Sequence, residues 1–119
     1  MKGLSIITAV TLVLTAFAFP ARAGIQEATG RVTLLRVHDV GTRYGPPTDQ
    51  IDVEVVIWLD SQPGKAFGFQ LRSDAYYAAH QAMLDLLRDA FNNNWAVTID
   101  YNEVPGRRNS VLFRVWLTK

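Results

Sequence analysis

A single stretch of the chain has helical periodicity, and the segments on both sides of it alternate with a period of two. It runs from Phe69 to Asn94 and reads FQLRSDAYYAAHQAMLDLLRDAFNNN. Its apolar positions recur at helical spacing and are Tyr76, Ala79, Met83, Leu87 and Ala90. Ser73 or Asp74 can accept the free amide hydrogens at the helix start, and the asparagines at 92–94 tolerate the left-handed conformation common at a helix end. The fold must therefore accommodate one helix among short strands.

The alternating segments predict five strands. The clearest runs from Ile51 to Asp60, where apolar residues occupy every second position. In segment 30–39, Val32 and Leu34 share one face whereas Leu35 and Val37 share the other, and this phase change predicts a bend or β-bulge. The other strands are predicted at 67–71, 97–101 and 111–117, with loops at 40–50, 61–65 and 102–110.

Apolar residues on the second face of these strands argue against a flat sheet. The residues concerned are Val56, Trp58, Leu112 and Trp116. Closure into a barrel removes the sheet edges, and a helix between the third and fourth strands covers the open end. We therefore predict a mainly β domain with one helix, a small five-stranded barrel of the oligonucleotide/oligosaccharide-binding (OB) type. The alternative is an open antiparallel sheet with one helix packed across it.

The first 23 residues have the pattern of a secretory signal peptide. Lys2 precedes an apolar run from Leu4 to Phe19, and small residues follow at 21–23. The run is short for a bilayer span of about 20 residues, so we expect cleavage after Ala23 rather than a stable membrane anchor. The prediction is a periplasmic or secreted binding domain at 24–119.

Charge and composition exclude several classes of protein. The chain has 12 Lys and Arg and 11 Asp and Glu, and loss of Lys2 and Arg22 leaves ten against eleven. This balance provides no basic surface for nucleic acid. The absence of cysteine excludes disulfides and a thiolate nucleophile. His38 and Asp39 have no third partner at ligand spacing, and no catalytic motif stands out, so we expect no enzyme activity, no metal and no cofactor.

Short motifs in the chain resemble the binding subunits of bacterial A-B toxins. They are TGRVTLLRVH at 29–38 and VTIDYNEVPG at 97–106, and their likeness is to the subtilase-cytotoxin and typhoid-toxin branch. The segment KAFGFQLRSDAYYAAHQAMLDLLRDAF also resembles the strand and helix of the cholera type. The resemblance implies a ring of five subunits, a cell-surface glycan ligand and an exported catalytic A subunit as partner.

The resemblance also implies a sialic acid site. A hydroxyl residue before a glycine contacts the sugar carboxylate in that branch, and Thr29 and Gly30 match this pair. Tyr101 stands at the place of the tyrosine that helps to read the sugar. The alternative is that Thr29 is a plain strand-end residue and Tyr101 a half-buried barrel residue.

Two further groups of residues are candidates from the pattern alone. Arg107 and Arg108 lie in the loop that flanks the usual OB ligand face, so they could meet an anionic sugar or a phosphate, or they are solubilising turn residues. The second-face residues Val56, Trp58, Leu112 and Trp116 predict a subunit interface. The alternative for the two tryptophans is that they cover a barrel end under the 40–50 loop.

These observations predict a non-catalytic, homopentameric binding subunit that recognises a sialic-acid-like glycan through several weak sites at once. The second hypothesis is a periplasmic OB-fold protein-interaction module that binds no sugar.

Overall fold

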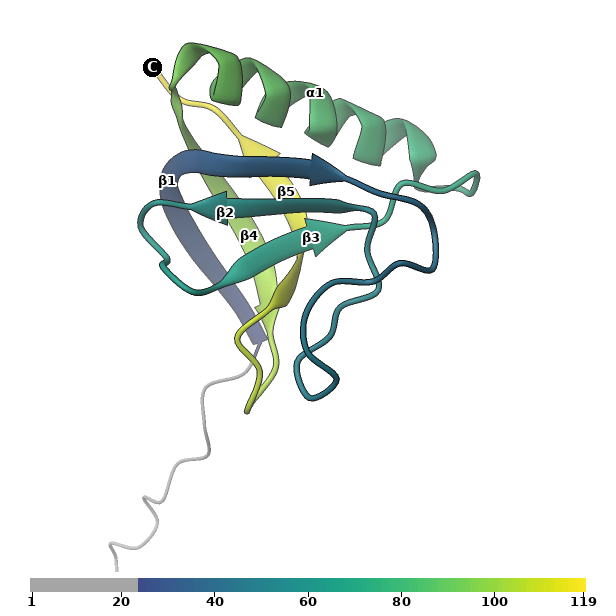
Figure 1. The fold of residues 1–119 in the computed structure, drawn as a ribbon. Helices are drawn as coiled ribbons and strands as arrows, with labels where there is room; N and C mark the ends of the chain where they lie inside the picture. Colours follow the sequence, from purple (N-terminus) through teal and green to yellow (C-terminus); the bar gives the residue numbers. More distant parts are fainter. Residues whose placement is uncertain (1–23) are drawn as a thin grey trace, which may run out of the picture.

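The computed structural model describes residues 24–119, which form a closed β-barrel with one helix. The predicted signal peptide at 1–23 lies outside the described residues. The elements are β1 (Gly24–Val37), β2 (Val55–Leu59), β3 (Ala66–Phe69), α1 (Tyr77–Asn93), β4 (Ala96–Glu103) and β5 (Ser110–Trp116). The strand order around the barrel is β1-β2-β3-β5-β4 (Figure 1). The predicted class, a mainly β OB-like barrel with its helix after the third strand, is confirmed.

The long first strand belongs to both halves of the barrel. Its first part pairs with β4 and its second part pairs with β2, and a register shift between Val32 and Leu34 separates them. The predicted bulge is therefore confirmed. Because Thr33 is the extra residue, Val32 and Leu35 face the main core whereas Leu34 faces outward, so the predicted shared face of Val32 and Leu34 is wrong.

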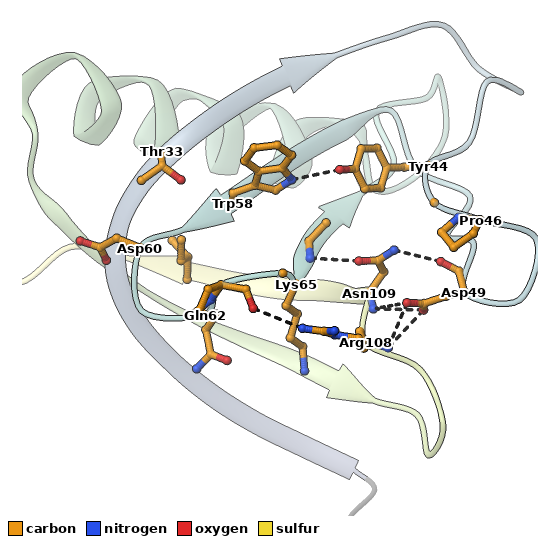
Figure 2. A pocket seen from close by; sticks show the side chains of 15 residues that line it. Thr33, Tyr44, Pro46, Asp49, Trp58, Asp60, Gln62, Lys65, Arg108 and Asn109 are labelled. Atoms are coloured by element: carbon orange, nitrogen blue, oxygen red, sulfur yellow. Dashed lines mark hydrogen bonds between the residues drawn. The ribbon is translucent and has the colours of Figure 1, made fainter.

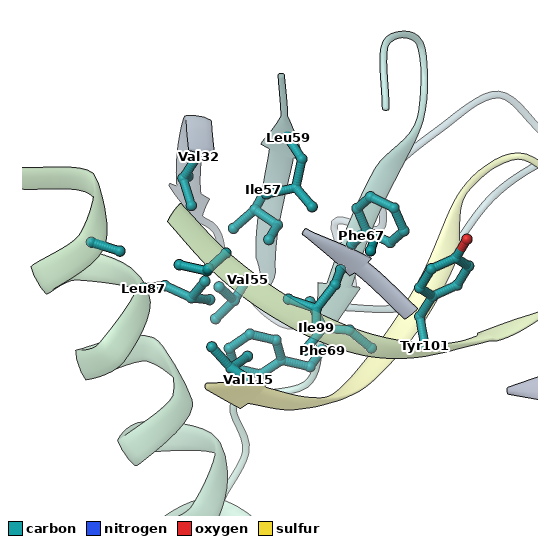
Figure 3. Close-up of a cluster of buried hydrophobic side chains, with 14 residues drawn as sticks. Val32, Val55, Ile57, Leu59, Phe67, Phe69, Leu87, Ile99, Tyr101 and Val115 are labelled. Carbon is teal, nitrogen blue, oxygen red and sulfur yellow. The ribbon is translucent and has the colours of Figure 1, made fainter. Parts of the chain in front are cut away.

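The main core fills the barrel, and the helix closes one of its ends (Figures 1 and 3). Leu87 and Ala90 of α1 are buried among barrel side chains that include Val55, Ile57, Phe67, Phe69 and Ile99. Asp74 accepts the Tyr76 amide hydrogen at 2.9 Å before the helix, and Asn94 ends it with a φ of 57°. The C-terminal end therefore behaves as the sequence predicts. The predicted cap at the start is wrong, because the N-cap residue is Tyr76, which makes no side-chain capping bond, and the Asp74 carboxylate binds an amide that precedes the first helical residue.

A second, smaller core covers the outer face of β2 and β3. The segment between β1 and β2 folds back over these strands, so that Ile51 and Val53 pack on Val56 and Ala66. Gly68 permits this approach, since a Cβ atom there would lie 2.5 Å from the Val53 side chain. Residues 51–54 were predicted as part of a strand, but β2 begins only at Val55. They act instead as a cover for the barrel wall.

The last strand changes phase where the sequence shows simple alternation. Leu112 pairs with Tyr101 whereas Arg114 pairs with Asp100, so Phe113 is an extra residue. Leu112 consequently points into the main core, and Phe113 is exposed. The prediction that Leu112 lies on the outer face is wrong for this reason.

Candidate functional site

A hollow of about 560 Å³ lies over β2, beside the small second core. Its walls come from the β1–β2 connection, the β2–β3 turn and the β4–β5 loop (Figure 2). In OB folds the face of strands two and three and the flanking loops is the usual place for an oligonucleotide or oligosaccharide. The hollow therefore lies where a ligand of this fold class would bind.

An indole group provides the main apolar surface of the hollow. Trp58 projects from the outer face of β2 and keeps 43% of its surface exposed. Its Nε1–H donates a hydrogen bond of 3.0 Å to the hydroxyl of Tyr44, which fixes the orientation of both rings (Figure 2). Tyr44 is held in turn by paired backbone hydrogen bonds with Ile51. An oriented aromatic ring of this kind is a rigid platform for stacking.

The opposite wall is built around one carboxylate. Asp49 accepts the backbone amide hydrogens of Arg108 and Asn109 at 3.1–3.2 Å. The Asn109 side chain donates to the Asp49 carbonyl at 2.9 Å and accepts the Ala66 amide hydrogen at 3.0 Å. These bonds tie the β1–β2 connection, the start of β3 and the β4–β5 loop together, so two loops and one strand form a single wall.

Tight backbone packing supports this wall. Gly45 has a φ of 105°, and a Cβ atom there would collide with the Asp49 carbonyl oxygen. Only glycine adopts this conformation without strain and leaves room for Asp49. The "YGPPTDQ" stretch, which looks like an ordinary loop in the sequence, is therefore built for one defined shape.

Arg108 supplies positive charge that no carboxylate neutralises within residues 24–119. Its guanidinium Nη2 donates only to the carbonyl of Pro63, at 3.4 Å. Lys65, which also lines the hollow, forms an ion pair with Glu103 at 3.4 Å. Asp60 is engaged through the Arg31 amide hydrogen, at 2.9 Å. The Arg108 guanidinium is thus the cation of the hollow that is free to pair with an anion.

The residues of the predicted sialic acid site are not brought together. Thr29 is exposed on the outer face of β1, where its hydroxyl lies 2.9 Å from that of Thr98. Tyr101 points into the barrel and is only 5% exposed, with its ring against Phe67 and under the Lys65 ammonium group. The two residues lie on opposite faces of the sheet and three residue pairs apart. They cannot contact one monosaccharide from these positions.

Gly30 has a packing role in this structure. A Cβ atom at Gly30 would lie 2.5 Å from the Ser61 hydroxyl oxygen and 2.7 Å from an Asp60 carboxylate oxygen. The glycine therefore allows the turn after β2 to approach β1 closely.

The predicted arginine pair divides between two roles. Arg108 lines the hollow, whereas Arg107 donates from Nη1 to the Gln50 carbonyl at 2.9 Å and is not among the lining residues. Sequence reasoning missed Tyr44, Asp49 and Asn109. The concentration of Gly, Pro, Asn and Asp in the two loops is the only sequence feature that marks them.

The predicted subunit interface is wrong for two of its four residues. Val56 and Leu112 have at most 1% of their surface exposed, so they cannot contact a neighbouring subunit. Trp58 lines the hollow beside Tyr44 of the 40–50 loop, but it lies on the outer wall of β2 and covers no barrel end. Trp116 alone of the four stays half-buried on the outer face of β5.

Comparison of the chain with protein-family models, with curated proteins and with solved structures gives no significant match. Within residues 24–119, no group of three His, Cys, Asp or Glu side chains could hold a metal ion. No helix in that range is both long and apolar enough to cross a bilayer.

Proposed function

We propose that this domain is an exported, non-catalytic binding module that recognises an acidic glycan in the hollow over β2. The observation that supports it is the pairing of an oriented, exposed indole with an unneutralised guanidinium in one concave site. Sugars present apolar ring faces that stack on aromatic side chains, and Arg binds carboxylates through two parallel hydrogen bonds. Trp58 and Arg108 together suit a sugar that carries a carboxylate.

The wall around Asp49 favours binding without rearrangement. Its hydrogen bonds fix the loop that carries Arg108 before any ligand arrives, so less conformational entropy is lost on binding. Assembly into a ring of five and association with a catalytic subunit are what the toxin resemblance implies, and binding in the hollow requires neither. A ring would multiply the affinity of a weak single site.

The test is binding of the protein comprising residues 24–119 to a panel of neutral and carboxylated oligosaccharides. Arg108→Gln should weaken binding of carboxylated sugars by about 10–100-fold, since a hydrogen bond to a charged group contributes about 1.5–3 kcal/mol. It should change binding of the matching neutral sugars much less. Trp58→Ala should weaken both groups of sugars, because the stacking platform is lost.

Two matched substitutions serve as controls. Arg107→Gln changes the neighbouring charge outside the hollow, and Trp95→Ala removes an exposed indole at the end of the helix. Neither should alter sugar binding. The proposal is wrong if no carboxylated sugar binds, or if Arg107→Gln and Arg108→Gln have equal effects.

A further inference from the structure

The outer face of β1 carries an ordered row of exposed polar side chains. Ala28 and Val32 point into the core, so the alternate residues Glu27, Thr29 and Arg31 point outward. Thr29 lies midway between an acid and a base. A rotation of 180° about an axis through Thr29 and perpendicular to the strand therefore exchanges the positions of the negative and the positive charge.

Neither charged side chain of this row has an oppositely charged partner within the described chain. Glu27 and Arg31 take part in no ion pair within residues 24–119. The other two charges of this face, Asp100 of β4 and Arg114 of β5, lie in the same cross-strand row as Glu27 and pair with each other at 3.0 Å. The Arg31 side chain is held in place by a hydrogen bond of 3.1 Å from its Nε to the Asn94 carbonyl. The two Nη groups of Arg31 are therefore held in position and form no hydrogen bond within residues 24–119.

The neighbouring strands widen the row into a face. Thr98 of β4 lies opposite Thr29, with the two hydroxyl oxygens 2.9 Å apart, and Trp116 of β5 lies opposite Thr98. Apolar groups mark the two ends of this face. Ile25, beyond Glu27, is 66% exposed, and Trp95, beside the strand pair of Arg31, is 49% exposed.

We propose that this face of β1, β4 and β5 pairs with the same face of a second copy, across a two-fold axis that passes near Thr29. Such an axis sets Glu27 of each copy against Arg31 of the other, which gives two equivalent ion pairs. It also brings the Ile25 end of one copy to the Trp95 end of the other. A two-fold contact has this reciprocal form, in which residue i meets residue j and j meets i.

Geometry and charge both favour this occupant. Glu27 and Arg31 are about 13 Å apart along the strand at about 3.3 Å per residue, and stacked sheets lie about 10 Å apart, which long side chains from both copies can span. A parallel arrangement would instead oppose like charges. Trp116 then contributes to an interface, as the sequence predicts, although the contact is of another kind from the predicted ring.

The test is sedimentation equilibrium of the protein comprising residues 24–119 from about 1 to 500 µM, because so small a face should give a weak, concentration-dependent dimer. Glu27→Arg and Arg31→Glu should each weaken the dimer by about 100-fold or more, because each substitution places like charges together twice. The double variant, with both charges reversed, should restore the dimer. Rising salt should weaken the wild-type dimer.

The helix offers a matched control, since Asp85 and Arg88 form an exposed ion pair away from this face. Asp85→Arg should leave the dimer unchanged. Circular dichroism of each variant then tests whether it is folded. A monomer throughout the concentration range overturns the proposal, and so does an assembly of any size that the single charge reversals leave intact. Failure of the double variant to re-form the dimer overturns it as well.

Discussion

Removal of the Asp49 carboxylate should destabilise the protein and loosen the wall of the hollow together. Asp49→Ala leaves the amide hydrogens of Arg108 and Asn109 without their acceptor. The Arg108 amide hydrogen can bind water instead, because Arg108 is exposed. Asn109 is buried, and an unsatisfied buried amide hydrogen costs about 1–3 kcal/mol. We therefore expect a loss of about 2 kcal/mol in the free energy of unfolding.

Urea denaturation followed by fluorescence measures this loss. With a slope of about 2 kcal/mol per molar urea, the transition midpoint should fall by about 1 M. Asp39→Ala is the control, because the Asp39 side chain lies exposed in the same connection and only its carbonyl accepts a hydrogen bond. Equal midpoints for the two variants would refute the view that Asp49 organises the wall.

Two further predictions concern the core and the pH dependence. Leu87→Ala should cost about 2–5 kcal/mol in urea denaturation because Leu87 is fully buried in the barrel end, whereas Phe91→Ala on the exposed helix side should cost under about 1 kcal/mol. Similar losses would show that α1 does not seal the barrel. The hydrogen bonds from Arg72 lower the pKa of Glu54 below that of an unpaired glutamate, although burial opposes this. This stabilisation is complete above the unfolded-state pKa and is lost as the pH falls through the lower folded-state pKa, so Glu54→Gln should flatten the acid side of the stability profile. A profile as steep as the wild type's would contradict this assignment.

The order of the elements could be predicted because it depends on local periodicity. Alternation marks β2 and β4, and helical spacing with terminal asparagines marks α1. Closure followed from apolar residues on both strand faces, since these residues need cover on two sides. Alternation also placed Tyr101 on the same face as Val97 and Ile99, which the structure buries. The pattern therefore already pointed to a core position for this tyrosine.

The errors arise where distant segments decide the outcome. The Phe113 bulge depends on the register between β4 and β5, and an alternating sequence contains no mark of it. Val56 is buried because the β1–β2 connection packs over it, which depends on how that connection folds back. The hollow has the same origin, because three connections that are far apart in the sequence meet over β2 to line it.

The β1–β2 connection therefore links stability to the candidate site. Ile51 and Val53 at its end bury the outer face of β2, while Tyr44 and Asp49 within it form walls of the hollow. The same backbone serves both purposes, so a substitution that loosens the small second core should also misplace the partner of the Trp58 indole. A ligand that contacts both Trp58 and Arg108 would stabilise the packing of this connection against the barrel. Ligand binding should for that reason raise the urea midpoint of the wild type and recover part of the stability that Asp49→Ala loses.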